Sequence, residues 1–194
     1  VSVIELASVL SQMKVRPKRS LVFIGFYGEE RGMLGSTYYG KNPVFPLAKT
    51  IAGINLEHMG RTDDVEGVRK DEASMTGFDY SDVGTTLAEA GDAVGIKVTK
   101  HPQNSDPFFM RSDNAALARV GIPSHSLCTA FIFPDYHKVG DHWDKVDYDN
   151  LAKVLKMVGL GLMMMGDSPK EPKWNEDNPR TTRYVEAWKK LRGG

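Results

Sequence analysis

The sequence predicts an α/β fold of stacked layers, in which helices cover a mixed, mostly parallel central sheet. Helical and strand patterns alternate along the 194 residues, which favours a layered arrangement over separate helical and sheet domains. The strand pattern at residues 21–27 is nearly all apolar, as expected for a central strand that is covered on both faces. Similar apolar runs at 51–56 and 124–130 predict two further buried strands.

The expected elements can be placed in chain order. Residues 1–14 carry apolar side chains at helical spacing and begin without an N-cap residue. The others are the strand at 21–27, a helix at 34–39, the strand at 51–56, a helix at 81–93, a short strand plus loop at 97–110, a helix at 114–120, the strand at 124–130, and helices at 148–165 and 181–191. Asp147 is the expected N-cap of the helix at 148–165. We expect one domain over residues 1–194, with 168–194 as a C-terminal tail that carries a surface helix.

Composition excludes several classes of protein. The chain is 41% hydrophobic and 26% charged, which is typical of a globular domain rather than a disordered chain or a coiled coil. Because 25 basic residues balance 25 acidic ones, no overall field favours nucleic acid or an anionic membrane. The apolar stretch at 157–165 is too short to span a membrane. A single cysteine, Cys128, excludes an internal disulfide and a cysteine zinc cluster, and its apolar neighbours indicate a core position.

Charged side chains follow the ends of the predicted strands. Glu29 and Glu30 come just after the strand at 21–27, Glu57 follows the strand at 51–56, and His137 lies in the loop after the strand at 124–130. Taken singly, a solvated turn or a surface histidine would explain each of them. In an open α/β sheet, however, functional groups collect at the carboxyl ends of strands. Carboxylates and imidazole are normal zinc ligands, so the combination predicts a catalytic zinc site.

Four ordered motifs resemble those of the M28 family of zinc aminopeptidases and carboxypeptidases. They read FYGEERGMLGS at 26–36, INLEHMG at 54–60, RSDNAALARVGIP at 111–123 and DYHKVGDHWDKVD at 135–147. The resemblance covers nearly all of the chain except the tail. It implies a layered α/β/α, phosphorylase/hydrolase-like zinc-exopeptidase fold. It also implies metal-assisted hydrolysis of a peptide substrate, with an N-terminal residue as the expected target.

The resemblance also implies roles for individual residues. Glu29 corresponds to the general base that takes a proton from the metal-bound water. Glu30 and His137 correspond to ligands of one zinc ion. Glu57 corresponds to a ligand of the other zinc ion and is also placed to meet the free α-amine of the substrate. Tyr136 would donate its hydroxyl to the developing oxyanion.

Further residues of these motifs are expected to support the site. Arg111 is expected to contact the substrate or to orient Glu29, and Asp113 and Asp141 to support the ligands without binding metal. Asn114 stands where many relatives have His, so no ligand is expected there. The remaining histidines have no matched ligand role and are expected to be structural: His58, His101, His125 and His142.

Two further ligands of the family, an early His and a bridging Asp, have no counterpart in this sequence. In the family they precede a helix that resembles residues 1–14, so we expect an N-terminally incomplete fold. A complete site should hold two Zn²⁺ ions, whereas this chain should hold at most one, weakly, and be inactive alone. An incomplete sheet edge would favour self-association. The family resemblance implies a secreted or periplasmic location.

Two alternatives stay open at this point. One is a noncatalytic, peptidase-like interaction module, although the presence of Glu29, Glu30, Glu57, Tyr136 and His137 argues against it. The other is a mononuclear zinc acyltransferase that resembles glutaminyl cyclase. The motif at 26–36 and the block at 111–123 look more like those of the peptidases. Zinc stoichiometry would separate the two enzymes, because two ions favour the peptidase and one favours the cyclase.

Overall fold

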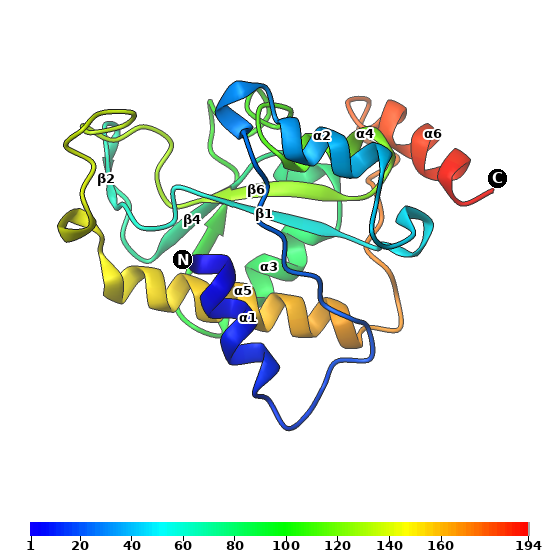
Figure 1. The fold of residues 1–194 in the computed structure, drawn as a ribbon, viewed down its shortest axis with the longest axis horizontal. Coiled ribbons are helices and arrows are strands. Elements are labelled where there is room, and N and C mark those ends of the chain that lie inside the picture. The colour runs from blue at the N-terminus through cyan, green and yellow to red at the C-terminus, as the bar shows by residue number, and fades with distance from the viewer. Residues whose placement is uncertain (194) are drawn as a thin grey trace.

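Four strands form the central sheet of the structure, a computed structural model that describes residues 1–193 (Figure 1). Their order across the sheet is β1 (Gly53–Glu57), β6 (Ser124–Cys128), β4 (Glu72–Met75) and β5 (Lys97–Thr99). β1 pairs with β6 in parallel and β4 pairs with β5 in parallel, whereas β4 and β6 are antiparallel. The predicted α/β fold with a mixed, mostly parallel sheet is therefore confirmed.

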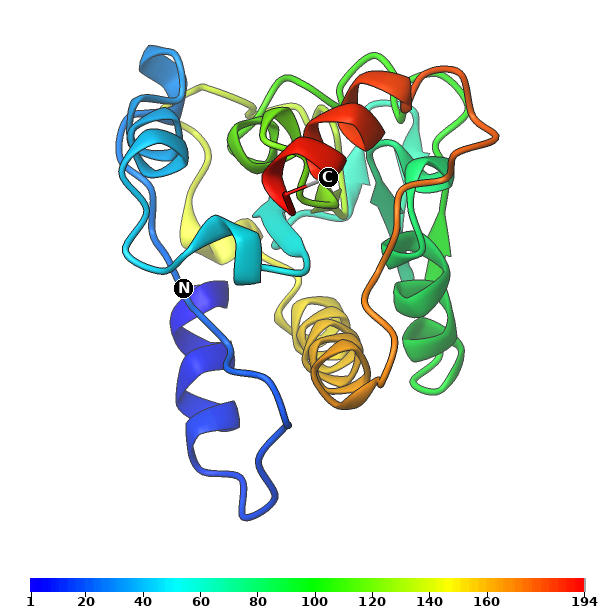
Figure 2. The same cartoon turned by 90° about the vertical axis from the view of Figure 1, so that its right-hand side faces the viewer.

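Helices cover both faces of this sheet. One layer contains α1 (Ser2–Ser11), α3 (Val83–Asp92) and α5 (Tyr148–Asp167), which lie below the sheet in Figure 1. The other layer contains α2 (Leu34–Lys41), α4 (Asn114–Arg119) and α6 (Thr182–Leu191), and Figure 2 shows the two layers on opposite sides of the strands. Short 3₁₀ helices and a small hairpin complete the described elements: η1 (Glu29–Arg31), η2 (Leu47–Lys49), η3 (Phe78–Tyr80), η4 (Trp143–Lys145), β2 (Asp63–Asp64) and β3 (Gly67–Val68).

The main core lies between the sheet and the α3 and α5 layer. Met75 and Leu127 from the strands pack with Leu87 of α3 and Val154 of α5, and all four side chains are fully buried. α5 begins where the sequence predicts, because the Asp147 carboxylate accepts a hydrogen bond of 3.0 Å from the backbone amide of Asn150. The predicted N-cap is thus confirmed. No helix in residues 1–193 is both long and apolar enough to cross a bilayer.

A second, smaller core joins the C-terminal tail to the body. Tyr184 of α6 stacks on Trp174, with ring centroids 4.9 Å apart, and both lie against Phe109. The indole of Trp174 donates a hydrogen bond of 2.7 Å to the carbonyl of Gly121. The predicted helix at 181–191 is present, but one of its faces is buried, so it is more than a surface appendage.

The strand predicted at residues 21–27 is wrong. This segment has no regular secondary structure, and it forms no ladder with any strand of the described chain. Val22 is 48% exposed and Tyr27 is 70% exposed, while Phe23 packs on the main core. An apolar run satisfies the burial pattern of a strand, but a strand also needs hydrogen-bond partners along its length.

Other elements differ from the prediction in smaller ways. β1, expected to be buried, is half-buried and is the outermost strand on its side of the described sheet. The sequence pattern did not predict β4, because the four residues EASM are too short and mixed to give a strand signal. It did not predict the β2–β3 hairpin either. The remaining helices and strands were placed to within a few residues.

Candidate active site

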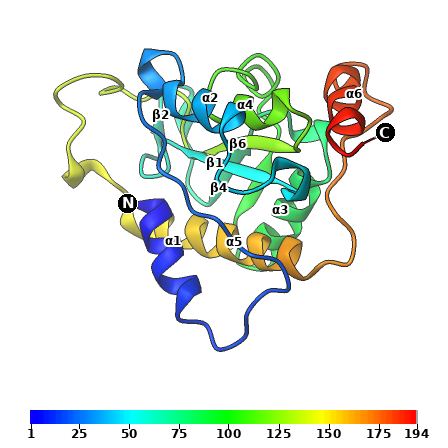
Figure 3. The same cartoon turned by 45° about the vertical axis from the view of Figure 1, so that its right-hand side comes forward.

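The predicted site residues converge at the carboxyl end of β1 and β6. Glu57 is the last residue of β1 and pairs in register with Cys128, the last residue of β6. Glu29 and Glu30 reach the same place from η1, and Tyr136 reaches it from the loop after β6. That loop, residues 131–147, projects from the body of the molecule in Figure 3. The convergence expected from the positions of the strand ends is therefore present.

The turn that presents Glu29 and Glu30 depends on two glycines. Gly28 precedes η1 with φ 69° and Gly32 follows it with φ 97°, values that favour glycine because it has no Cβ. A third left-handed residue, Met33 with φ 56°, then leads into α2. This sequence of left-handed positions reverses the chain sharply and places two adjacent carboxylates at the sheet edge.

Glu29 lies in a negative environment. Its pKa is raised from the ordinary value, first by partial burial and then by the carboxylates of Glu57, Glu30 and Asp113. His137 acts in the opposite direction and lowers it. A group of carboxylates this close together favours the binding of a cation or of a proton.

Glu57 is held by donors from neighbouring elements. The Asn55 amide donates a hydrogen bond of 2.8 Å to its carboxylate, and the Ser112 hydroxyl donates another to the same oxygen. The Asn55 amide also contacts the hydroxyls of Ser112 and Ser126, at 2.9 and 3.0 Å. Because Asn55 and Glu57 are two residues apart on one strand, their side chains share a face. That spacing was a signal for Asn55 that the sequence interpretation did not use.

Tyr136 and His137 stand beside the two glutamates. The pKa of the Tyr136 phenol is raised by burial, and then by Glu30, Glu29 and Glu57. The His137 Nε2 lies 3.4 Å from a carboxylate oxygen of Glu30. His137 has φ 56°, a left-handed backbone that is uncommon for a residue with a side chain. Strained backbone of this kind is concentrated at functional sites.

A cavity of about 250 Å³ opens at this cluster. Its lining combines charged groups with aromatic and small side chains, and consists of Glu29, Glu30, Glu57, His58, Thr76, Phe108, Arg111, Ser112, Ser126, Cys128, Phe131 and Tyr136. The carboxylates and the tyrosine therefore share one space with a largely uncharged wall. His58, expected to be structural, is part of this wall, and its ring meets that of Tyr136 with centroids 5.0 Å apart.

The three expected supporting residues have different surroundings. Asp113 is buried near Glu57, accepts a hydrogen bond from the Ser36 hydroxyl, and has a pKa raised by burial. Arg111 lines the cavity with its guanidinium 4.7 Å from the centre of the Phe108 ring. Asp141 binds the guanidinium of Arg61 at 2.8 Å and is not part of the cavity lining. The roles predicted for them stay predictions.

Other candidates are engaged elsewhere in the fold. Cys128 is buried, and burial raises the pKa of its thiol to about 12, which opposes a role as nucleophile. His101 contacts Glu66 at 2.9 Å. His125 is buried between Ser81 and Thr76. Asn114 donates to the carbonyls of Phe109 and Ser124.

The pair of Glu30 and His137 offers zinc-binding atoms, but it does not complete a zinc centre. A carboxylate and an imidazole suit Zn²⁺, which in catalytic sites has three protein ligands. Residues 1–193 contain no group of three or more His, Cys, Asp or Glu side chains arranged to hold a metal. The residues present therefore fit part of such a site, and the number of ions stays a prediction.

Comparison with known proteins gives the family. The family model for Peptidase family M28 matches residues 1–160. No curated protein matches the chain. Among solved structures, an aminopeptidase from Aneurinibacillus sp. strain AM-1 is 26% identical with a TM-score of 0.69, over 88% of this chain and 38% of that one.

Two further structures share the fold. BSAP, a zinc aminopeptidase from Bacillus subtilis, is 21% identical with a TM-score of 0.68, over 88% of this chain and 41% of that one. LapA aminopeptidase from Legionella pneumophila is 20% identical with a TM-score of 0.69, over 87% of this chain and 45% of that one. The chain thus spans less than half the length of each of these relatives. Because the family model matches residues 1–160 of 194, the chain belongs to peptidase family M28.

Proposed function

We propose that this chain contributes the general base, the oxyanion donor and part of the metal site of a zinc-dependent aminopeptidase. The observation that carries the proposal is the meeting of Glu29, Glu30, Glu57 and Tyr136 at one cavity, with His137 beside Glu30. Membership of family M28 supports hydrolysis of peptide bonds. The aminopeptidase structures that share the fold support action at an N-terminus.

Glu30 and His137 would hold one metal ion, and Glu57 would contribute to a second. Their oxygen and nitrogen atoms suit zinc, and Bacillus subtilis BSAP is described as a zinc aminopeptidase. Zinc in such a site polarises the substrate carbonyl and lowers the pKa of a bound water. Ligands beyond these residues are required, so we expect the 194-residue chain alone to be inactive.

Glu29 is the proposed general base. It lies next to Glu30 in η1 and faces the same cavity, so its carboxylate can accept a proton from the attacking water and return it to the leaving amine. The raised pKa supports this role, because a base works best when its pKa approaches the working pH.

Tyr136 is the proposed oxyanion donor. Its phenol has a raised pKa and therefore stays protonated at neutral pH. A neutral hydroxyl is able to donate a hydrogen bond to the negative oxygen that develops on the substrate carbonyl. We propose that this bond strengthens in the transition state and so raises kcat.

Glu57 and the cavity wall account for action at an N-terminus. A carboxylate fixed by Asn55 and Ser112 would pair with the positive α-amine of a peptide. Phe108, Phe131 and the methyl-bearing wall at Thr76 would accept an apolar first side chain. We therefore propose peptides with an apolar N-terminal residue as the substrate class.

A pair of matched substrates tests this proposal. The protein extended to the length of the solved relatives would be assayed with leucine p-nitroanilide and with its N-acetylated form. The proposal predicts hydrolysis of the free-amine substrate and at least about a hundredfold slower hydrolysis of the acetylated one, since the charge pair with Glu57 is lost. Equal rates would contradict aminopeptidase action. No hydrolysis, with or without zinc, would favour the interaction module, and transfer chemistry without hydrolysis would favour the acyltransferase.

A further inference from the structure

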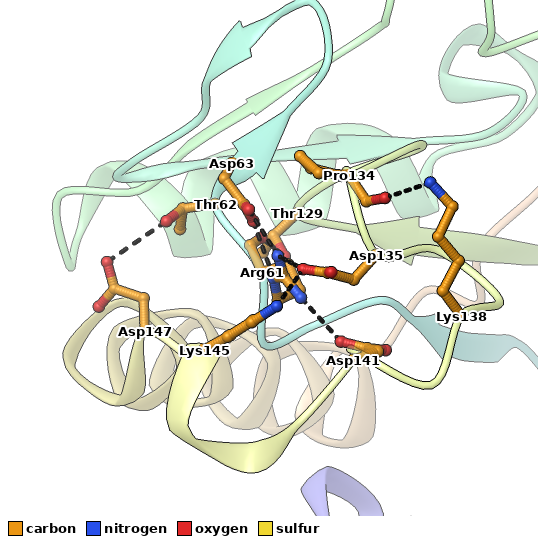
Figure 4. A network of polar contacts seen from close by, with 10 residues as sticks. All are labelled: Arg61, Thr62, Asp63, Thr129, Pro134, Asp135, Lys138, Asp141, Lys145 and Asp147. Atoms are coloured by element: carbon orange, nitrogen blue, oxygen red, sulfur yellow. Dashed lines mark hydrogen bonds and ion pairs between the residues drawn. The ribbon is translucent and has the colours of Figure 1, made fainter.

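Arg61 is a buried cation just beyond the end of β1 to which the proposed chemistry gives no role. Only 4% of the residue is exposed, yet its guanidinium binds three carboxylates. It donates to Asp63 at 2.8 and 2.5 Å, to Asp141 at 2.8 Å and to Asp135 at 3.1 Å. Figure 4 shows these groups gathered around the one side chain.

Two of the partners of Arg61, Asp135 and Asp141, are the end residues of loop segment 135–141, which contains Tyr136 and His137. Asp135 immediately precedes Tyr136, and Asp141 follows His137 by four residues. One guanidinium therefore ties both ends of segment 135–141 to the turn after β1. The planar fork of arginine allows this, because it presents several N–H donors in fixed directions, whereas lysine presents one point charge.

The guanidinium of Arg61 also supports the same loop through an aromatic ring. It lies 4.6 Å from the centre of the Phe133 ring. The Phe133 ring in turn meets the rings of Tyr136 and His58, both with centroids 5.5 Å apart. The Thr129 hydroxyl holds the backbone of Arg61 itself, because it donates a hydrogen bond of 2.8 Å to the Arg61 carbonyl. Arg61 is thus packed against the ring that supports Tyr136.

Segment 135–141 makes few other contacts with the body of the protein. Within segment 135–141 the backbone hydrogen bonds are local, such as that from Lys138 to Asp135 at 2.8 Å, and Val139 is 96% exposed. His137 needs a left-handed backbone there. Lys145 adds a contact to Asp135 at 2.7 Å, but its side chain is 39% exposed.

We propose that Arg61 is a positioning residue that holds segment 135–141 so that Tyr136 and His137 face Glu29 and Glu30. Arg61 does not line the cavity, and it acts through Asp135, Asp141 and Phe133. The catalytic consequence rests on the proposed function, whereas the structural consequence does not.

Hydrogen exchange measured by mass spectrometry tests the structural consequence. Arg61→Gln and Arg61→Lys are expected to speed amide exchange of residues 133–141 about tenfold or more. Peptides from β6 and α5 should keep their protection, which shows that the protein remains folded. Arg61→Lys keeps the charge and the aliphatic stem, so it serves as the test if Arg61→Gln fails to fold.

Arg69→Lys is the matched control. Arg69 is also buried, at 8% exposure, and also binds a carboxylate, that of Glu72 at 2.8 Å. It contacts no residue of segment 135–141, since its other contacts are with Ser74 and Phe131. The control should leave exchange of residues 133–141 unchanged. Unchanged exchange of this segment in both Arg61 variants would overturn the inference.

Kinetics on the extended, zinc-loaded protein test the catalytic consequence. Arg61→Lys should lower kcat about 10- to 100-fold with little change in KM, because Tyr136 acts on the transition state. A raised KM with unchanged kcat would overturn a role in positioning Tyr136. If exchange of the loop increases but the wild-type protein hydrolyses no peptide, the proposed function fails and the structural inference stands.

Discussion

His125 is a buried side chain whose charge state is fixed by its neighbours. Its Nδ1 lies 2.9 Å from the carbonyl of Thr76, which can only accept, so Nδ1 carries the proton. The Ser81 hydroxyl then donates to Nε2 at 2.6 Å. Complete burial lowers the pKa of the ring from 6.5 to about 4, so the native protein holds His125 neutral.

Neutral His125 predicts a loss of stability at mildly acidic pH. Below about pH 6.5 His125 is protonated in the unfolded chain, whereas in the native state it stays neutral down to about pH 4. The free energy of unfolding therefore falls as the pH falls from about 6.5 to about 4. The contribution is about 2 kcal/mol between pH 7 and pH 5. Urea unfolding of the wild type and of His125→Asn, each at pH 7 and at pH 5, measures this contribution. The wild type should lose about 2 kcal/mol more than the variant, and equal losses would contradict the assignment.

The chemistry-bearing residues could be predicted from sequence more readily than their supports. Glu29, Glu57 and Tyr136 stand in recognisable motifs at strand or loop ends, and the structure gathers them at one cavity. The contact of Ser112 with Glu57 and that of Arg61 with Asp141 gave no such signal, because the two residues of each pair lie 55 and 80 positions apart in sequence. Contacts of this range are set by the tertiary fold, which single-sequence patterns do not contain.

At the scale of elements, η1 depends on glycines in left-handed positions on both of its sides. Gly32 has φ 97°, and a Cβ placed there would meet no atom within 4 Å. Any cost of a side chain at this position is therefore backbone strain rather than collision. Gly25 would also give a Cβ open space, but it lacks the left-handed backbone, so it offers a matched comparison.

Gly32→Ala is expected to destabilise the protein by about 1 kcal/mol, since the strain of a left-handed alanine exceeds the gain from a less flexible unfolded chain. Gly25→Ala should be neutral or slightly stabilising, because only the second effect applies to it. Thermal or denaturant unfolding of the two variants gives the comparison. Equal stability of both variants would show that the turn at η1 does not need glycine.

The segment at 21–27 shows where element prediction from sequence reaches its limit. Its composition gives the pattern of a buried strand, yet the segment has no regular secondary structure. Composition indicates only whether a segment prefers to be buried, whereas a strand also needs a neighbouring backbone to pair with. Within residues 1–193 no strand pairs with segment 21–27. By contrast α5 was predictable in detail, because its periodicity and the Asp147 cap are local.

At the scale of the whole molecule, the tail is held by its own aromatic cluster. Tyr184 is 2% exposed and packs on Trp174 and Phe109. The expectation of one domain over residues 1–194 stays a prediction, and this packing is what we propose joins the tail to it. Self-association through an incomplete sheet edge also stays a prediction, and sedimentation velocity would measure it.

Tyr184→Ala should destabilise the protein by about 3 kcal/mol, because it empties a buried aromatic site. Glu186→Ala, at an exposed position of the same helix, is the control and should change stability by less than about 0.5 kcal/mol. Denaturant unfolding followed by tryptophan fluorescence reports on both. If Tyr184→Ala left the free energy of unfolding nearly unchanged, the aromatic cluster would not be what holds α6 to the body.

The most direct test of the whole account separates the two adjacent glutamates. In the extended protein, kcat, KM and zinc content would be measured for Glu29→Gln and Glu30→Gln under the same conditions. Glu29→Gln should retain zinc while kcat falls about 10²- to 10⁴-fold, and Glu30→Gln should lose at least one zinc ion together with activity. Full activity of Glu29→Gln, or unchanged zinc content in Glu30→Gln, would contradict the assignment of base and ligand.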